Sequence, residues 1–368
     1  MTRKKISSFM SRQSESAPLR VGLLGAGGIA PNHAEVLKQL PGVTLAAVCD
    51  TSTGRAKALA NDWGIPAVYG SLADMVCREK LRAIHVLTPP QTHAELALQC
   101  IRAGCDVFVE KPLGATVEEC RILNQAALEA GRVIGVNHQL TYAPALTELI
   151  DVIRSRKLGR LNDVMMTYTV VAANVPVRDP SHFMFQSFGN MILEAGPHPF
   201  SVIHRLMGKL RTMSTFVSGE VKIGCGKSYY KNWLCSMVCE RGTAQLYISF
   251  AIGPREASVH AIGEDATAIA DLKRNTVQLY ESTRYPITGD VREAWRNAKR
   301  TICATSSTLF GYYANKVKLR PGSMHHSSIS AFYRALAGGH PSVETGKSGM
   351  AVVEYCEQSA KSVIITER

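Results

Sequence analysis

The sequence lacks the features that mark membrane proteins, disulfide scaffolds and repeat proteins. It contains no run of about 18 apolar residues, so we expect no membrane-spanning helix. The ten cysteines include no Cys-x-x-Cys pair, which favours reduced, mostly buried thiols in a cytoplasmic protein over a disulfide framework. No internal repeat occurs. Residues 1–18 are polar, basic and rich in Ser, without the apolar middle of a secretory signal, so we expect a disordered extension there.

Acidic residues are the minority charge: 30 Asp and Glu stand against 42 Lys and Arg, giving a net charge of +12. Beyond the first twenty positions the basic residues are scattered, and no basic stripe alternates with aromatics, so we expect no nucleic-acid partner. The excess charge indicates a solvated basic surface or a mild field that favours anionic ligands. The chain has 368 residues, of which 46% are apolar, enough for two domains with sizeable cores.

From residue 19 to about 140, short apolar runs alternate with segments of helical spacing. Strands are predicted at 21–24, 43–49, 67–69, 83–87, 106–109 and 133–136. Two of the helices between them carry Thr-x-x-Glu capping-box patterns, at 92–95 and 116–119. Such alternation is typical of βαβ units, which build a parallel sheet covered on both faces. We therefore predict an α/β fold whose domain at 19–140 is a doubly wound Rossmann sheet.

The remainder, 141–368, has a different pattern. A connecting helix is predicted at 142–157, followed by strand-like runs at 164–170, 212–221, 229–239, 243–250, 257–262 and 276–280. Consecutive strands separated by short turns indicate a large, mostly antiparallel sheet in a C-terminal α+β domain. Helices predicted at 327–337 and 349–364 would cover this sheet or pack back on the first domain.

A glycine motif follows the first predicted strand and leads into a helix. It has the form G-x-G-x-x-A, with Gly25 at the tight turn, Gly27 where the backbone must approach a pyrophosphate, and Ala30 against the strand. A helix N-terminus at this point offers free N–H groups to phosphates. The alternative, a plain turn, is less favoured because strand and helix flank the motif correctly. The motif predicts a dinucleotide site.

Asp50 ends the second predicted strand, about 20 residues beyond the glycines, where a carboxylate accepts hydrogen bonds from the adenosine ribose. Because a carboxylate repels a 2′-phosphate, Asp50 favours NAD over NADP. Arg55, a few residues later, leaves room for NADP.

Three further segments complete a pattern: Thr-Pro-Pro-Gln-Thr-His at 88–93, Glu-Lys-Pro at 110–112, and Glu-Ala-Gly-Pro-His at 194–198. With the glycine motif and Asp50, the chain resembles the Gfo/Idh/MocA family, which includes glucose–fructose oxidoreductase and inositol dehydrogenase. The resemblance implies hydride transfer at a secondary alcohol or ketone of a sugar, nucleotide sugar or cyclitol. It also implies a homo-oligomer, a dimer or tetramer, formed through the exposed face of the sheet.

The resemblance implies that Lys111 and His198 are the catalytic pair. A histidine that titrates near neutrality suits the proton transfer, and a lysine ammonium can stabilise a developing alkoxide. Glu194 would orient His198 or bind a substrate hydroxyl, and Tyr142 would line the substrate entrance. The alternative reading of both catalytic candidates is structural: a solvated strand end for Lys111 and a packed ring for His198.

The expected cofactor-binding residues are Gly25, Gly27, Gly28, Ile29, Asp50, Thr51, Arg55, Thr88, Pro89, His93, Glu110, Lys111 and Asn137. His93 would cap its helix or contact the nicotinamide side, and Asn137 would face the same cleft. Pro112 is a candidate for a cis peptide bond. Three positions depart from the family pattern: Glu194 and Ser201 where Asp is usual, and Asn190 where Gly is usual. These departures bear on substrate choice more than on the reaction.

Competing functions remain open at this point. A metal site formed by Glu194, His198 and His204 is a weaker hypothesis than hydride transfer, because Gly196-Pro197 interrupts the helix that would align the three residues. We therefore expect no metal. Some relatives use bound NAD transiently to cleave glycosidic bonds, and others are non-catalytic NAD-binding regulators. Retention of both Lys111 and His198 argues against a regulator.

Overall fold

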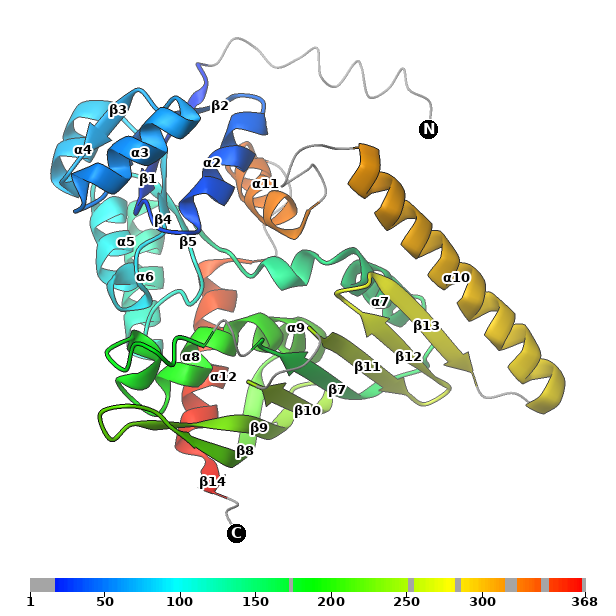
Figure 1. Ribbon diagram of the computed structural model, residues 1–368. Helices are drawn as coiled ribbons and strands as arrows, with labels where there is room; N and C mark the ends of the chain where they lie inside the picture. The colour runs from blue at the N-terminus through cyan, green and yellow to red at the C-terminus, as the bar shows by residue number, and fades with distance from the viewer. Residues whose placement is uncertain are drawn as a thin grey trace, which may run out of the picture.

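A computed structural model describes residues 17–171, 175–250, 255–281, 286–314, 323–338 and 344–365. Two β-sheets organise the chain (Figure 1). The first, smaller sheet lies in the N-terminal half with helices on both faces, and the second carries its helices on one face. The predicted combination of a Rossmann sheet with a larger, mostly antiparallel sheet is confirmed.

The first sheet has six strands in the order β3-β2-β1-β4-β5-β6, and every neighbouring pair is parallel. Its strands are β1 (Leu19–Leu24), β2 (Val43–Cys49), β3 (Ala67–Tyr69), β4 (Ala83–Val86), β5 (Asp106–Val109) and β6 (Ile134–Val136). The chain reverses its direction of growth between β1 and β4, and ligands of such sheets bind at the carboxyl ends of strands beside that point.

Helices α2 (Ala30–Gln39), α3 (Thr53–Trp63), α4 (Leu72–Glu79), α5 (His93–Arg102) and α6 (Val117–Ala130) connect these strands. Ser52, Ser71 and Thr116 each cap a helix by accepting a backbone N–H two or three residues into it. The capping box predicted at Thr92 is wrong, because that hydroxyl donates instead to Pro89 O and lies 2.8 Å from Thr88 Oγ1. A short 3-10 helix, η1 (Pro90–Thr92), begins the turn instead.

The second sheet has eight strands in the order β13-β12-β11-β7-β10-β9-β8-β14. They are β7 (Leu161–Thr169), β8 (Leu210–Lys222), β9 (Ser228–Cys239), β10 (Gly242–Ser249), β11 (Ala257–Gly263), β12 (Ala266–Asp271), β13 (Thr276–Glu281) and β14 (Val363–Ile365). β7 pairs with β10 and β14 pairs with β8 in parallel, while the other pairs are antiparallel. Buried and exposed residues alternate along β9 and β11, as expected for a sheet packed on one face.

The remaining helices are α7 (Pro144–Arg154), α8 (Asn190–Ala195), α9 (Pro197–Met207), α10 (Pro286–Ala314), α11 (Met324–Leu336) and α12 (Gly346–Lys361), with 3-10 helices η2 (Gln139–Tyr142) and η4 (Phe183–Phe185). The last predicted helix was drawn too long: it ends at Lys361, and residues 363–365 form β14. Three apolar residues in succession suit an edge strand as well as a helix end, so periodicity alone does not separate the two.

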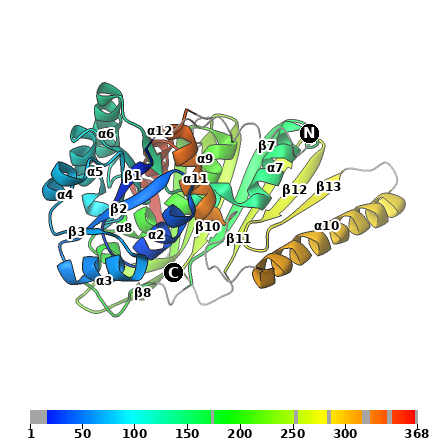
Figure 2. The same cartoon turned by 90° about the horizontal axis from the view of Figure 1, so that it is seen from above.

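Two helices that follow the second sheet in sequence pack back on the first. Ile329, Phe332 and Tyr333 of α11 join the core beneath α2 and α3, and Val353 of α12 joins the core on the opposite face of the Rossmann sheet. α12 also contacts α9 and β8, so it lies between the two sheets (Figures 1 and 2). α11 and α12 thereby hold the two sheets together.

α10 has no counterpart among the sequence predictions. It lies along β13, at the edge of the second sheet (Figures 1 and 2). Asn297 accepts a hydrogen bond from Leu279 N and donates one to Leu279 O, so its amide satisfies the free backbone groups of the edge strand. The helix therefore caps the sheet edge with polar side chains, which is why its sequence shows no inward apolar stripe.

All ten cysteines are free thiols in the described ranges, and seven of them are buried. In the part of the chain that the structure describes, each helix is too short or too polar to cross a bilayer.

Candidate functional site

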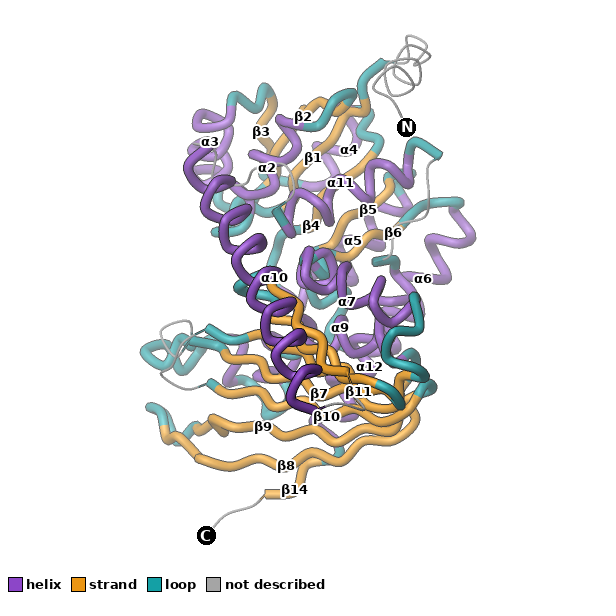
Figure 3. The backbone as a smooth tube through the Cα atoms, turned by 90° about the vertical axis from the view of Figure 1, so that its right-hand side faces the viewer, coloured by secondary structure: helices purple, strands orange, loops and turns teal. Residues whose placement is uncertain are grey.

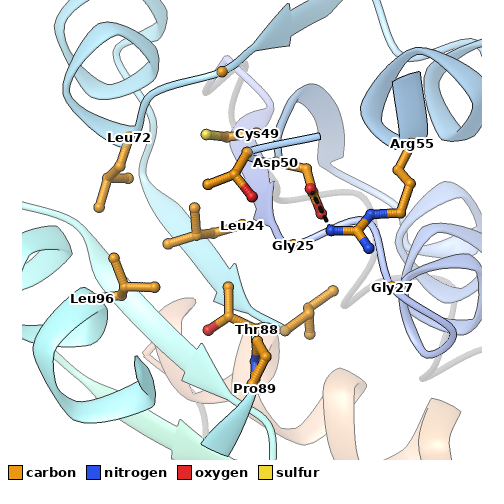
Figure 4. Close-up of a pocket in the computed structure, with 13 residues that line it drawn as sticks. Leu24, Gly25, Gly27, Cys49, Asp50, Arg55, Leu72, Thr88, Pro89 and Leu96 are labelled. Atoms are coloured by element: carbon orange, nitrogen blue, oxygen red, sulfur yellow. Dashed lines mark hydrogen bonds and ion pairs between the residues drawn. The ribbon is translucent and has the colours of Figure 1, made fainter. Parts of the chain in front are cut away.

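The first pocket, which we call the glycine-loop pocket, opens at the carboxyl ends of β1, β2 and β4 (Figure 4). It is a cavity of about 340 Å³ lined by Leu24, Gly25, Gly27, Cys49, Asp50, Thr51, Arg55, Gly70, Leu72, Leu87, Thr88, Pro89 and Leu96. Seven of the predicted cofactor-binding residues therefore line one cavity. Gly25, Gly27, Asp50, Thr51, Arg55, Thr88 and Pro89 already share it.

Position 25 requires a glycine, because the backbone of Leu87 lies against it. The φ of Gly25 is +104°, and a Cβ there would lie 2.8 Å from the carbonyl carbon and oxygen of Leu87. At Gly27 and Gly28, by contrast, a Cβ would meet no atom within 4 Å. The loop therefore has one glycine demanded by packing and two that leave open space beside the start of α2, as close approach of a ligand requires.

Asp50 ties the end of β2 to the glycine loop. Its Oδ2 accepts from Ala26 N at 2.8 Å, and its Oδ1 accepts from Ser52 N at 2.7 Å and from Arg55 at 3.0 Å. Burial raises the pKa of this carboxyl, but the backbone hydrogen bonds and Arg55 outweigh burial and leave the pKa below its usual value. Asp50 is thus an ionised acceptor at the pocket wall, and Arg55 is engaged with it (Figure 4).

A second pocket, which we call the lysine pocket, adjoins the first and shares Leu87 and Thr88 with it. Its cavity of about 300 Å³ is lined by Ile29, Leu87, Thr88, Pro90, His93, Glu110, Lys111, Gln139, Glu194, His198 and His325. Lys111 and His198, which come from different halves of the chain, therefore face one cleft beside the glycine loop.

Lys111 lies two residues beyond the end of β5, and its bond to Pro112 is cis, as the sequence suggested. Its ammonium donates to Glu194 Oε1 at 2.6 Å and to the Glu194 carbonyl at 2.9 Å. The side chain of Lys111 is 14% exposed and that of Glu194 is 33% exposed, so the pair stands at the wall of the cleft. Glu194 contacts Lys111 rather than orienting His198, which corrects one of its two predicted roles.

His198 is the second residue of α9, after Pro197, and its ring is half-buried. The ring lies 6.1 Å from that of Tyr168, at the end of β7. Burial and the nearby charge of Lys111 hold the pKa of His198 well below its usual value. The imidazole is therefore neutral at physiological pH and able to accept a proton.

Glu110 and Asn137 form a polar layer next to Lys111. Asn137 Nδ2 donates to Glu110 Oε1 at 2.6 Å, and Lys111 N donates to Glu110 Oε2 at 3.1 Å. Asn137 is buried and is not among the residues that line the pocket, so it stands behind Glu110 rather than facing the cleft as predicted.

His93 links the two loops that shape the cleft. Its Nδ1 lies 2.6 Å from Pro112 O and its Nε2 lies 2.7 Å from Thr88 O. The ring lines the lysine pocket but is almost fully buried, and neither nitrogen is free. The helix-capping role suggested for His93 is wrong.

Several other predicted residues have structural partners. Tyr142 ends η2 and is not among the residues lining the lysine pocket, whereas Gln139, the first residue of η2, is. Ser201 donates its hydroxyl to His198 O, and Asn190 donates to Phe183 O. His204 Nδ1 lies near Gly208 O, away from Glu194. Within the described ranges, no three His, Cys, Asp or Glu residues gather as a metal site would require.

Sequence reasoning missed three residues at this site: His33, Gln139 and His325. His325 lines the pocket and contacts Asn137 at 3.2 Å, while His33 lies 2.9 Å from Glu110. His33 comes eight residues after Gly25 on the helix that the glycine motif starts, and that position was a usable signal. His325 had none, because it reaches the site through the packing of α11.

The two pockets fit a dinucleotide. The open space beside Gly27 and Gly28 at the start of α2 suits a pyrophosphate, and the ionised Asp50 suits a ribose. Asn137 Oδ1, behind Glu110, is a buried acceptor with no donor among the described residues.

Comparison with known proteins places the chain. Residues 19–138 match the Gfo/Idh/MocA model, described as an oxidoreductase family with an NAD-binding Rossmann fold. The chain is 28% identical to 1,5-anhydro-D-fructose reductase of Ensifer adhaerens over 90% of its own length and 92% of that protein. It is 27% identical to inositol 2-dehydrogenase of Klebsiella pneumoniae, over 74% and 86% respectively.

Among solved structures, the WlbA dehydrogenase of Bordetella pertussis, in complex with NADH and UDP-GlcNAcA, superposes with a TM-score of 0.77. It shares 18% sequence identity, and the match covers 94% of this chain and 96% of that one, so it shows the fold alone. The resemblance carried by the glycine motif, Asp50 and the Glu-Lys-Pro segment is confirmed, because the residues that match the Gfo/Idh/MocA oxidoreductase model include all three.

Proposed function

We propose that the protein transfers a hydride between NAD and a secondary alcohol or ketone carbon of a carbohydrate-like substrate. The observation that carries this proposal is the convergence of Lys111, Glu194 and His198 on one pocket that adjoins the glycine-loop pocket. When bound, NAD supplies the hydride acceptor in its nicotinamide ring. The relatives named for anhydrofructose and inositol support a polyhydroxylated substrate.

In the direction of oxidation, the protein must remove a proton from the substrate hydroxyl as the hydride leaves the adjoining carbon. His198 is neutral, because its pKa is lowered by burial and by Lys111, and it takes this proton. The Lys111 ammonium donates a hydrogen bond to the same oxygen and stabilises its growing negative charge. In the direction of reduction, His198 returns the proton to the carbonyl oxygen.

Glu194 fixes the Lys111 ammonium through two hydrogen bonds, to its carboxylate and to its carbonyl. Lysine side chains carry substantial rotamer entropy, so this anchoring reduces the cost of placing the charge at the reacting oxygen. The half-exposed carboxylate has room to accept a substrate hydroxyl as well. We assign Glu194 to orienting both the lysine and the substrate.

We further propose that NAD is preferred to NADP. The ionised Asp50 stands where an adenosine ribose would bind, and a 2′-phosphate there would face its negative charge. Arg55, the cation that could offset a phosphate, is paired with Asp50 at 3.0 Å.

An absorbance screen tests the proposed reaction. Purified protein is first checked for NAD binding by fluorescence, and then sugars, nucleotide sugars and cyclitols are supplied with NAD or NADP while NADH formation is followed. We expect NADH with at least one of them. Cleavage of nitrophenyl glycosides with no net NADH would favour the glycosidase alternative, and bound NAD without any turnover would favour a regulator.

We propose that the chain forms a homo-oligomer, a dimer or tetramer, through the second sheet. Helices cover one face of this sheet, and the other is open (Figure 3). Met165, Leu234, Val238 and Tyr247 are between 38% and 45% exposed on β7, β9 and β10. Exposed apolar residues gathered over neighbouring strands are typical of interfaces. Light scattering of wild type and of Leu234→Glu would test this, with a fall in mass expected for the variant.

We also propose a cytoplasmic location. Ten free thiols, seven of them buried, suit a reducing compartment. Fractionation of cells with a compartment marker would test it.

A further inference from the structure

A chain of four side chains runs through the interior from α11 to the carboxylate beside Lys111. Tyr333 Oη lies 2.8 Å from His85 Nε2, His85 Nδ1 lies 2.8 Å from His33 Nδ1, and His33 Nε2 lies 2.9 Å from Glu110 Oε1. The four residues come from α11, β4, α2 and the end of β5. Tyr333 reaches the other three only because α11 packs against α2 and the core of the Rossmann domain.

The chain is sealed from solvent. The side chains of His33 and His85 are 0% exposed, and the ring of Phe108 lies within 6 Å of both. Tyr333 is 6% exposed and stacks on His85 with ring centroids 5.9 Å apart. In such surroundings every polar proton needs an acceptor, because an unpaired buried group is costly.

The end at Glu110 sets the direction of the first hydrogen bond. Burial alone would raise the pKa of Glu110, but the hydrogen bonds from His33 and Asn137 lower it overall, so the group is a carboxylate. A carboxylate only accepts hydrogen bonds, so His33 must carry its proton on Nε2. Burial also lowers the pKa of His85, so that ring is neutral and carries one proton.

Two arrangements of protons remain, and the hydroxyl of Tyr333 separates them. If the proton between the two rings belongs to His85 Nδ1, then His85 Nε2 accepts from Tyr333, and every proton has an acceptor. If it belongs to His33, then His85 Nε2 donates to Tyr333. The Tyr333 hydroxyl proton is then left without an acceptor among the described residues. The first arrangement is favoured.

A second arm joins α11 to the same carboxylate. His325, the second residue of α11, contacts Asn137. Asn137 donates a hydrogen bond to Glu110 Oε1, which His33 Nε2 also contacts. Glu110 Oε2 accepts from Lys111 N. Both arms therefore end on the group that holds the backbone of the lysine segment.

We propose that His33, His85 and Tyr333 are positioning residues, a hydrogen-bonded chain of fixed direction, Tyr333 to His85 to His33 to Glu110, that holds the Glu110 carboxylate and with it the Lys111 segment. The proposal rests on the function proposed above for Lys111. The three residues contact neither cleft, so they act through Glu110.

The direction of the chain can be measured without substrate. In protein labelled with ¹⁵N-histidine, nitrogen–proton correlation spectra report which ring nitrogen carries the proton. Signals are assigned by their loss in His33→Gln and His85→Gln. We expect His33 protonated at Nε2 and His85 at Nδ1. A proton on His85 Nε2, or an imidazolium at His33, would overturn the proposed direction.

Kinetics test the consequence for Lys111. Loss of a buried hydrogen bond to a charged group is worth about a tenfold change, so His33→Leu should lower kcat about tenfold while the Kd for NAD changes less than about twofold. His33→Gln, which keeps one donor and one acceptor, should restore kcat to within about threefold of wild type. A folded His33→Leu with wild-type kcat would refute the positioning role.

A second variant guards against loss of folding. Tyr333→Phe keeps the packed ring and removes only the donor, and we expect kcat to fall about threefold. Tyr280→Phe is the matched control, because Tyr280 is 39% exposed on β13 and bonded only to Gln278 among the described residues. Equal kcat in Tyr333→Phe and Tyr280→Phe would contradict the positioning role of the hydrogen-bonded chain. Because the spectra need no turnover, failure of the substrate screen would leave that test of the chain intact.

Discussion

The glycine-loop pocket and the lysine pocket share a wall but are built in opposite ways. The first combines the glycine loop, four leucines and the pair Asp50 and Arg55, all between residues 24 and 96 of the chain. The second adds, to residues between 29 and 93, side chains from segments near residues 110, 139, 194 and 325. One is a local consequence of β1, β2 and β4, whereas the other exists only after the whole chain has folded.

The difference separates binding from chemistry. The glycine-loop pocket offers open space beside Gly27 and Gly28 and an ionised Asp50, which suit the binding of a ligand and not the exchange of a proton near neutral pH. The lysine pocket holds a cation and a neutral imidazole, which are suited to moving a proton. If this division is correct, variants of the two pockets should affect different kinetic constants.

The largest effect is expected for Lys111→Ala. Removing the ammonium takes away a charge directed at the developing alkoxide and leaves Glu194 unpaired, so kcat/KM should fall about 10³-fold. NAD binding, measured by fluorescence, should change little. Lys347→Ala, at an exposed lysine on α12, is the control. Turnover close to wild type in Lys111→Ala would remove the assignment of this residue.

His198→Asn should lower kcat/KM for oxidation about 10²-fold, since the proton acceptor is lost. The pH profile of the wild type sharpens the test. A neutral imidazole is required, so oxidation is supported above the pKa of His198 and lost as pH falls through it. That pKa lies below 6.5 because of burial and Lys111, so the half-maximal rate should occur below pH 6.5. A midpoint above that value would contradict the assignment.

The sequence predicted what depends on neighbours in the chain. The turn at Gly25, Asp50 at the end of β2 and the βαβ alternation are all local, and each is found as expected. The position of Lys111 after β5 follows from the same pattern. That His198 faces the same cleft was available only from the family resemblance, because nothing between residues 111 and 198 fixes their distance.

What the sequence did not predict depends on packing between distant segments. Glu194 is 83 residues from Lys111, and His325 is 188 residues from Asn137, so neither contact has a signal in spacing. α10 was missed for a related reason. Its inward face meets the edge of β13 with Asn297, while Val291, Trp295 and Ile302 are more than half exposed. Prediction of helices from apolar periodicity fails for a helix whose inward face is polar.

A smaller effect is expected for Glu194→Asp, which keeps the carboxylate on a shorter side chain. The shorter arm withdraws the carboxylate by about one methylene, and changes of that size in a pocket alter discrimination by about tenfold or more. Preference between two substrates from the screen should therefore shift about tenfold, while kcat for the better one stays within an order of magnitude. Unchanged preference would indicate that Glu194 serves Lys111 alone and does not touch the substrate.

The smallest effect, and the one confined to the glycine-loop pocket, is expected for Asp50→Asn. The amide retains an acceptor for one of the two backbone N–H groups but loses the charge that excludes a 2′-phosphate and that pairs with Arg55. The Kd for NAD should rise about fivefold, the Kd for NADP should fall, and kcat at saturating cofactor should hold, because the lysine pocket is untouched. Thr53→Val, on the adjoining helix α3, serves as a control for local packing. A fall in kcat with unchanged cofactor affinity would contradict the division of binding and chemistry between the two pockets. The loss of charge at Asp50 would then have altered the reaction in the lysine pocket.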